Sequence, residues 1–432
     1  MIIRGGTVVT ARGVEKADIA IAGEQIMAVG LNLADDGEEI DASGLHVFPG
    51  GIDSHVHFNE PGRTEWEDIA HGSAALAAGG YTSFIDMPLN NLPVTTDVAA
   101  FDLKLKAMKR SSKVDFGLWG GLVPDNLDHL EELADRGVMG FKAFMCPSGI
   151  DEFQATDWMT LHEGMDRIGR LGSILLVHAE DPGIVDVRTR NALAAGRTRA
   201  LDFIRSRPEE AELEAISVLI NQALNTDCRI HVVHMSTDAG VAMVRAAQKL
   251  RDISCETCPH YLLYTEDDLE RLGGLGKCAP PFRTAGDRDT LWNFIADGTL
   301  PMVVSDHSPS TLELKQGDDF FKIWGGISGC QTTRQLLLGQ DRLPLPIVAA
   351  VTATNVAKRF GLEGKGDIAP GFDADLWIVD LSHEDVVRRQ DLLYRNPFSV
   401  HEGQRIRGRT VKTLVRGQDP GRGRFIRPGG RS

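Results

Sequence analysis

Eight short apolar segments, each followed by a stretch with helical spacing, recur between residues 47 and 340 and constrain the fold most. They are Val47–His57, Tyr81–Met87, Val114–Gly121, Val138–Phe144, Ser173–His178, Arg229–His234, Ile253–Cys258 and Met302–Asp306. Strands that alternate with helices pair in parallel, and eight such units close into a (β/α)8 barrel. Continuous apolar runs such as 174–177 are typical of strands buried on both faces. The sequence predicts an α/β fold whose main part is a TIM barrel.

The stretches between these segments carry apolar residues at three- and four-residue spacing, which predicts amphipathic helices. The clearest are Trp66–Ala78, Asp125–Arg136, Asp157–Leu171, Glu209–Leu224, Ala239–Leu250 and Arg288–Ala296.

Both ends of the chain differ from its middle, because short strands alternate there with turns that contain Gly and Pro. The expected strands are Ile2–Val9, Asp18–Ile21, Gln25–Val29, Glu39–Asp41, Asp375–Val379, Ile406–Arg409 and Thr410–Val415. Neither end is long enough to fold well alone. We therefore expect residues 1–46 and 365–432 to pair into one small β-domain beside a barrel of residues 47–364.

The formal net charge of −15 bears on location and partners. Five basic residues near the C-terminal end are Arg405, Arg407, Arg409, Lys412 and Arg416. Their alternation is typical of the solvent-facing side of a strand, and the chain lacks the basic surplus of nucleic-acid binders. No apolar run approaches the ~20 residues that span a bilayer, and the start lacks signal-peptide features. We expect a cytoplasmic protein that binds neither nucleic acid nor membrane.

Six cysteines are scattered along the chain, and reduced thiols are expected without an export signal. Cys255 and Cys258 form a CxxC pair, but a structural zinc site needs a second ligand pair, and none follows. We interpret these two as packed cysteines at a strand end.

Candidate metal ligands stand at the carboxyl ends of predicted strands, where barrel enzymes place their active sites. His55 and His57 are two residues apart, so their imidazoles point the same way on a strand. Such a pair alone is also found among surface or core histidines. His178, His234 and Asp306 end three further strands, which argues against coincidence. Four imidazoles and one carboxylate suit zinc or a similar divalent cation.

Lys142 lies at the end of the fourth segment, between Phe141 and Ala143. A charged lysine among apolar residues is costly. It either extends to solvent or has a lowered pKa that permits reaction with CO2. The resulting carbamate would be an anion able to bridge two metals with room for a bridging hydroxide. Given the other ligands, the carbamate is the preferred interpretation.

Asp306 can bind metal and also accept the proton of the attacking water, although a helix N-cap is the simpler alternative. We expect His307 and His260 to pack around the site rather than to bind metal.

These residues resemble the cyclic amidohydrolases, a family that comprises dihydroorotases, hydantoinases or dihydropyrimidinases, and allantoinases. The resemblance covers nearly the whole chain, from Phe48–His57 through Gly140–Lys142 to Gly366–Leu376. It implies that the two chain ends form the family's β-sandwich and that the enzyme is a homotetramer.

The resemblance also assigns roles to the site residues. It implies that His55 and His57 bind one metal, and that His178 and His234 bind the other. Carboxylated Lys142 would bridge both, and Asp306 would be both ligand and general base and acid. The cofactors expected are two divalent ions, zinc first, with cobalt, manganese, nickel or iron open. No Gly-rich phosphate loop opens a helix, so no organic cofactor is expected.

Departures from two branches of the family favour the third. Dihydroorotases usually carry an arginine that binds the substrate carboxylate, at the position where this chain has Asn59. They also usually have Met-Pro-Asn after the second strand, where this chain has Met87-Pro88-Leu89-Asn90. Hydantoinases usually place a tyrosine five residues after the bridging lysine, where this chain has Pro147. The segments that resemble allantoinases are Asn59–Glu67, Met87–Asn90, Cys255–Tyr261, Lys277–Arg283 and Trp324–Ile327.

This resemblance implies hydrolysis of the hydantoin ring amide of allantoin to allantoate by a metal-bridged hydroxide, in purine catabolism. Asn90, Ala279, Ser308 and Gly326 are the expected substrate-binding residues. Ala279 departs from the usual serine, but its backbone can still contact the ring. A hydantoinase, dihydropyrimidinase or dihydroorotase-like enzyme is the alternative in the same class. A metal-free scaffold protein is the alternative from another class. Metal content would distinguish it from an active enzyme, which should hold about two ions per chain.

Overall fold

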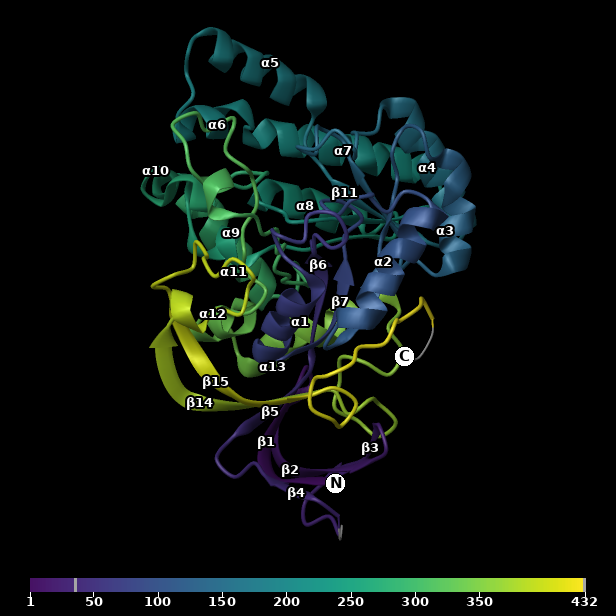
Figure 1. Ribbon diagram of the computed structural model, residues 1–432, viewed down its shortest axis with the longest axis vertical. Helices are drawn as coiled ribbons and strands as arrows, with labels where there is room; N and C mark the ends of the chain where they lie inside the picture. Colours follow the sequence, from purple (N-terminus) through teal and green to yellow (C-terminus); the bar gives the residue numbers. More distant parts are fainter. Residues whose placement is uncertain (35–36, 430–432) are drawn as a thin grey trace.

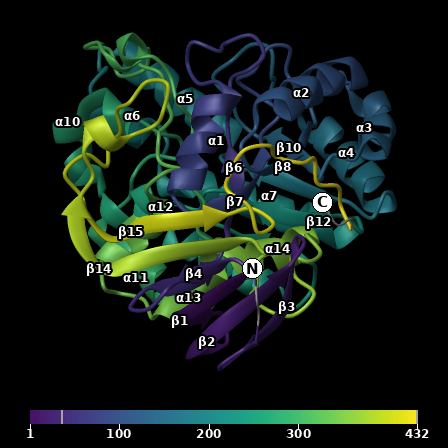
Figure 2. The ribbon, with the colours of Figure 1, turned by 60° about the horizontal axis from the view of Figure 1, so that its bottom comes forward.

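The computed structural model of the chain describes residues 1–34 and 37–429, so the last three residues of the expected C-terminal part lie outside it. Parallel strands are surrounded by helices, and a sheet built from both chain ends lies at one end of the molecule (Figures 1 and 2). The predicted barrel with an added sheet domain is confirmed.

The barrel strands form a three-stranded and a five-stranded parallel sheet. They are β6 (Gly51–Val56), β7 (Tyr81–Asp86), β8 (Asp115–Leu118), β9 (Gly120–Gly121), β10 (Phe141–Phe144), β11 (Ile174–His178), β12 (Arg229–Val232) and β13 (Ile253–Cys255). Trp119 separates β8 from β9, but its backbone N–H still donates to Asp86 at 3.0 Å. The two sheets are therefore joined through a single interrupted strand.

The eighth predicted segment closes the barrel without becoming a regular strand. Val303 pairs with Thr257 on one side, and His307 pairs with Val56 on the other, each as an isolated bridge. Thr257 N–H donates to Met302 at 3.1 Å, and His57 N–H donates to His307 at 2.8 Å. These few bonds bring Asp306 beside the end of β6.

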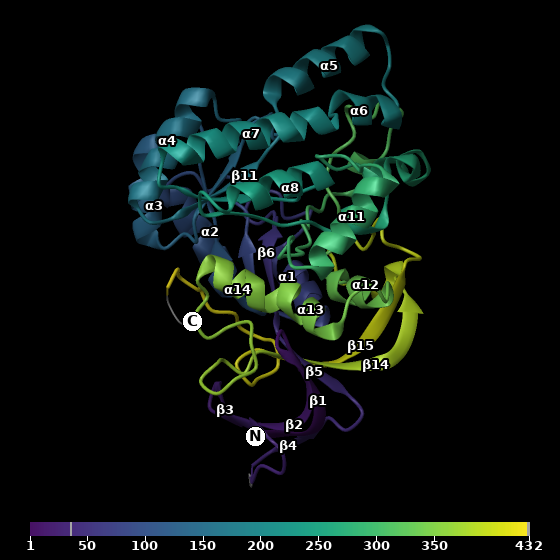
Figure 3. The ribbon, with the colours of Figure 1, turned by 180° about the vertical axis from the view of Figure 1, so that it is seen from behind.

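Helices cover the outside of the barrel, as Figure 3 shows from behind. They are α1 (Ile69–Ala78), α2 (Val98–Ser111), α3 (Leu130–Arg136), α4 (Trp158–Arg170), α5 (Pro182–Ala194), α6 (Ala200–Ser206), α7 (Glu209–Asn225), α8 (Asp238–Ala247), α9 (Pro259–Leu263), α10 (Leu269–Leu272), α11 (Ala285–Ala296), α12 (Thr333–Gly339), α13 (Leu345–Ala349) and α14 (Asn355–Phe360). Side-chain caps define several starts: Asp157 accepts from Thr160 N–H at 2.7 Å before α4. All six predicted helical stretches overlap a helix.

The chain ends meet in one seven-stranded sheet. Its strands are β1 (Ile2–Thr10), β2 (Gly13–Ala22), β3 (Gln25–Gly30), β4 (Glu39–Asp41), β5 (His46–Pro49), β14 (Leu376–Val386) and β15 (Arg405–Leu414). The order β15-β14-β5-β1-β2-β3 places β14 from the C-terminal part beside β5 from the N-terminal part, and Ile19 and Leu376 share one buried cluster. The two strands predicted within 406–415 are one strand, β15, because its pairing with β14 continues across Arg409 and Thr410.

The predicted strand Val47–His57 is two strands that belong to different sheets. β5 pairs with β1 and β14, whereas β6 pairs with β7 in the barrel. Gly50 lies between them, and a Cβ atom there would overlap the Thr82 side chain. Glycine thus allows the chain to pass from the sheet into the barrel at a close approach. The division at residue 46 remains a prediction.

The basic residues of β15 face acidic partners at the surface. Arg405 and Arg407 contact Asp341 at 2.7 and 3.2 Å, and Arg409 contacts Asp380 at 3.4 Å. This agrees with the expected solvent-facing side of a strand for the residues on β15. The prediction was wrong for Arg416, which follows the strand and is buried in contact with Asp115.

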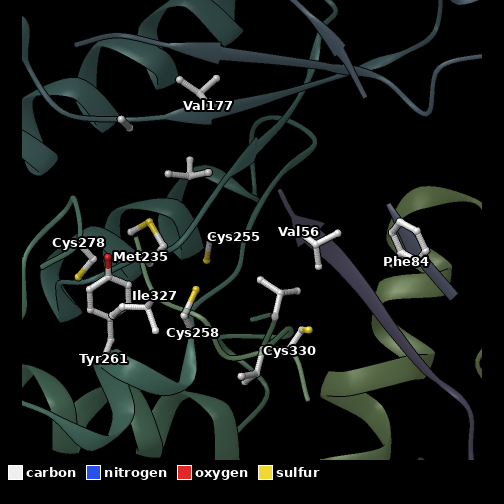
Figure 4. Packing of buried hydrophobic residues seen from close by; sticks show 14 of the residues in the cluster. Val56, Phe84, Val177, Met235, Cys255, Cys258, Tyr261, Cys278, Ile327 and Cys330 are labelled. Carbon is white, nitrogen blue, oxygen red and sulfur yellow. The ribbon is translucent and has the colours of Figure 1, made fainter. Parts of the chain in front are cut away.

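All six cysteines are buried and free, which agrees with the expected reduced thiols and with the expected packing of Cys255 and Cys258. Figure 4 shows Cys255, Cys258, Cys278 and Cys330 among Val56, Met235, Tyr261 and Ile327. Within the described residues, no helix is long and apolar enough to cross a bilayer.

A buried ionic cluster joins the barrel to the sheet domain. Lys365 Nζ lies 2.9 Å from Asp115 on β8, and 3.1 and 2.8 Å from Asp373 and Asp375, which precede β14. Arg416 also contacts Asp115. The surrounding carboxylates raise the pKa of Lys365 despite its burial, so this lysine is charged.

Replacing Lys365 with methionine is expected to lower the free energy of unfolding by about 3–5 kcal/mol, because three buried carboxylates lose their shared cation. The urea-denaturation midpoint measures the effect. Lys358→Met is the matched control, since Lys358 is exposed on the adjacent helix α14. Equal midpoints for the two variants would show that the cluster does not hold the domains together.

Candidate active site

A cavity of about 520 Å³ opens at the carboxyl ends of the barrel strands. Both the predicted metal ligands and the predicted substrate-binding residues line it: His55, His57, His178, His234 and Asp306 of the first kind, and Asn90, Ala279, Ser308 and Gly326 of the second. The tenth predicted site residue, Lys142, is fully buried on β10 and within electrostatic reach of the histidines. The structure thus brings all ten residues to one region.

The first group of potential ligands comes from β6 and the closing segment. His55 Nε2 lies 3.2 Å and His57 Nε2 lies 3.3 Å from Asp306 Oδ1. His55 Nδ1 contacts Glu256 Oε1 at 2.6 Å, which orients the ring so that Nε2 faces Asp306. The two histidines therefore point the same way, as their spacing predicts, and three ligand atoms converge.

The second group lies at the ends of β11 and β12. His178 Nδ1 lies 3.0 Å from His234 Nε2, and the ring of Phe144 stacks on that of His178 at 4.6 Å. His178 Nε2 contacts Glu180 Oε2 at 2.7 Å, so Nδ1 is the nitrogen left to face the site. Two ring nitrogens this close present a joint ligand pair for one cation.

Lys142 lies within electrostatic reach of both groups, and its amine lies over the Phe144 ring at 5.0 Å. Its side chain is fully buried, and Nζ makes no hydrogen bond to any described residue. Burial lowers its pKa to about 7. Burial also lowers the pKa of His55 and His234, and the charge of nearby Lys142 lowers both further. A buried amine without a hydrogen-bond partner is costly. A chemical modification or a bound ligand at this position would remove that cost.

Three non-glycine residues of the site have a left-handed backbone. The φ angles are 75° at Asn90, 40° at His234 and 44° at Asp306. Side chains other than glycine rarely adopt this region, and such strain concentrates where a side chain must be aimed at a functional site. These three residues are among the ten site residues predicted from the sequence, so their backbone conformation is consistent with a functional role.

The expected substrate-binding residues form a continuous edge of the cavity. Asn90 Nδ2 donates to Ser308 Oγ at 3.5 Å. Gly326 lies against Ser308, because a Cβ atom at Gly326 would be 2.5 Å from the Ser308 carbonyl oxygen. Gly326 N–H donates to Lys277 O at 2.8 Å, two residues before Ala279. Polar groups from three separate loops thus meet beside Asp306.

His307 and His260 are buried behind the cavity. His307 Nδ1 accepts from Gly329 N–H at 3.2 Å, and Nε2 lies 3.5 Å from Glu67. His260 packs against the Tyr261 ring at 4.3 Å. One His260 nitrogen also lies within 4.8 Å of ligand atoms of Asp306 and Cys258.

Two carboxylates of the site were not singled out from the sequence. Glu180 follows His178 by two residues, and Glu256 follows β13, each in contact with a site histidine. Glu180 follows His178 by two residues, the same spacing as between His55 and His57, so the sequence could have indicated Glu180 as a site residue. Glu256 lies 201 residues from His55 in the chain, and only the barrel brings them together.

A closed barrel with imidazoles and a carboxylate at its strand ends is the arrangement of metal-dependent hydrolases. The amidohydrolase family model matches residues 46–417, and the chain belongs to this family. An allantoinase of Rubrobacter xylanophilus is 51% identical over 99% of this chain and 97% of that protein. An allantoinase of Escherichia coli is 41% identical over 96% of this chain and 94% of that protein.

Solved structures named as hydantoinases and dihydropyrimidinases also resemble the chain. The L-hydantoinase (dihydropyrimidinase) of Arthrobacter aurescens has a TM-score of 0.95 at 32% identity, covering 99% of both chains. The dihydropyrimidinase of Brevibacillus agri has a TM-score of 0.91 at 31% identity, covering 99% of this chain and 98% of that one.

Proposed function

We propose that this protein hydrolyses the hydantoin ring amide of allantoin to give allantoate, as an enzyme of purine catabolism. The observation that carries the proposal is the meeting of His55, His57, His178, His234 and Asp306 around one cavity, with unpaired Lys142 beneath it. The names of relatives that are 41–51% identical over nearly the whole chain support the choice of substrate.

The residues present fit two divalent cations. His55, His57 and Asp306 would hold one, and His178 and His234 would hold the other. The orphan amine of Lys142 fits carboxylation by CO2, since a carbamate oxygen could serve each cation. When bound, the two cations lower the pKa of water and polarise the ring carbonyl. Zinc suits this set of nitrogen and oxygen ligands, and cobalt, manganese, nickel or iron are alternatives.

Asp306 would move the proton in both halves of the reaction. Its carboxylate accepts a proton from the attacking water while the water oxygen forms a bond to the ring carbonyl carbon. The proton then passes from Asp306 to the ring nitrogen as the carbon–nitrogen bond breaks. Protonation matters because an anionic amide nitrogen is a poor leaving group. The products are a carboxylate and an opened ureido chain, with no net change of oxidation state.

Asn90, Ser308 and the backbone near Ala279 and Gly326 would recognise the ring and its ureido substituent. All four line the cavity, and three of them lie next to one another beside Asp306. We also propose that the enzyme is a cytoplasmic homotetramer, an assembly that rests on the family resemblance.

A hydantoinase or dihydropyrimidinase is the second candidate, because solved structures that resemble this chain carry those names. Pro147 stands where hydantoinases usually have a tyrosine, which favours allantoin.

A substrate panel on metal-loaded protein separates these candidates. We expect kcat/KM for allantoin to exceed that for hydantoin, dihydrouracil and dihydroorotate by about 10²-fold or more. A chelator should abolish ring opening, and metal analysis should find about two ions per chain. Preference for dihydrouracil would favour the second candidate. Absence of bound metal together with absence of ring opening would indicate a scaffold protein.

A further inference from the structure

Two buried lysines hold one wall of the cavity, the irregular segment 321–326. Lys315 Nζ donates to the carbonyl oxygens of Trp324, at 3.0 Å, and Gly326. Lys277 Nζ donates to those of Phe321, at 3.4 Å, and Ile323. The hydrogen-bond partners of both amines are thus backbone carbonyls rather than carboxylates.

Burying these amines is costly. Each lysine is only 6% exposed, and burial lowers the pKa of both to about 7. Lys277 Nζ also lies 4.7 Å from the centre of the Phe203 ring. The energetic cost of burying two amines suggests that holding segment 321–326 in place is important for the cavity. As a consequence, four carbonyl oxygens of the wall are engaged by lysine and are not available to a ligand.

Trp324, in the middle of this wall, carries a donor without an acceptor. Trp324 lines the cavity, and its Nε1–H is buried with no hydrogen-bond partner among the described residues. The ring packs edge-on against Trp66 at 4.7 Å and 65°, which restricts its orientation. Leaving a buried donor unpaired is costly, and a ligand acceptor would remove that cost.

The donor is connected to the reacting centre through neighbouring residues. Gly326, two residues after Trp324, lies against Ser308. Ser308 is two residues after Asp306 and accepts from Asn90. A substrate whose ring lies at Asp306 and whose substituent follows this edge would bring that substituent to the wall.

Building on the proposed function, we propose that Trp324 Nε1–H donates to the carbonyl oxygen of the ureido substituent of allantoin, the group that unsubstituted hydantoin lacks. Lys277 and Lys315 are positioning residues, because they hold the segment that carries this donor. Recognition of the substituent then belongs to Trp324, and recognition of the ring belongs to the edge beside Asp306.

Trp324→Phe tests this assignment, because it removes the donor and retains an aromatic ring against Trp66. We expect KM for allantoin to rise about threefold to tenfold, the effect of one lost hydrogen bond. The kcat, and the inhibition constant of hydantoin as a competitor, should change by less than about twofold. The assignment would be overturned if KM for allantoin and the inhibition constant of hydantoin rose together, or if KM stayed unchanged.

Lys315→Met tests the positioning role, with Glu313→Gln as the control on the same short helix, Leu312–Lys315. We expect KM to rise in the lysine variant and to stay unchanged in the exposed control. A lysine variant that folds and keeps a normal KM would contradict the role. If it fails to fold, Trp324→Phe decides alone. Failure of the proposed function would be seen earlier, as wild-type protein that does not open allantoin.

Discussion

Replacing Lys142 with methionine is expected to lower kcat for ring opening by about 10⁴-fold or more and to reduce the bound metal. Methionine matches the length of the buried side chain but can neither react with CO2 nor offer an anionic ligand. Lys142 Nζ has no hydrogen-bond partner among the described residues and lies over the Phe144 ring at 5.0 Å, so the substitution breaks no hydrogen bond. Metal analysis and the thermal midpoint should accompany the rate measurement.

Two further measurements separate a bridging carbamate from an ordinary lysine. Wild-type protein reconstituted with isotope-labelled bicarbonate should show a carbamate signal by NMR that the Lys142→Met protein lacks. Short carboxylic acids should restore part of the activity of Lys142→Ala, because they place a carboxylate in the vacated space. A Lys142→Met protein with full metal content and full activity would refute the bridging role.

Replacing Asp306 with asparagine is expected to reduce kcat by about 10²–10⁴-fold, the usual contribution of a general base and acid. The amide has the same shape as the carboxylate and can still offer an oxygen to a cation. It cannot accept a proton from water or return one to the ring nitrogen. We therefore expect the loss in kcat to exceed any loss in metal content, which metal analysis on the same sample would show.

Asp267→Asn is the matched control for this experiment, since Asp267 is an exposed aspartate on the barrel surface. Its kcat should equal that of the wild type. If Asp306→Asn retains its metals and loses less than about tenfold in kcat, the proton must move through another group. His260 would be the next to test, because it reaches within 4.8 Å of Asp306.

Periodicity and strand order were enough to predict the position of the site. His55 and His57 share one side of a strand because side chains alternate, and their Nε2 atoms do both face Asp306. Parallel strands bring their carboxyl ends to one edge, which collects His178 and His234 there. The same reasoning failed for Val47–His57, because an apolar run does not show that its two halves pair with different sheets.

The sequence by itself determined the alternation of strands and helices, the pairing of the chain ends, and the ligand types at the strand ends. These follow from local spacing and from the requirement that exposed sheet faces be covered. Only the tertiary structure decided that Glu256 contacts His55, that Lys365 bridges two domains, and that lysines hold the wall at Trp324. Such contacts join residues far apart in the chain, and no local pattern specifies which buried charge meets which partner.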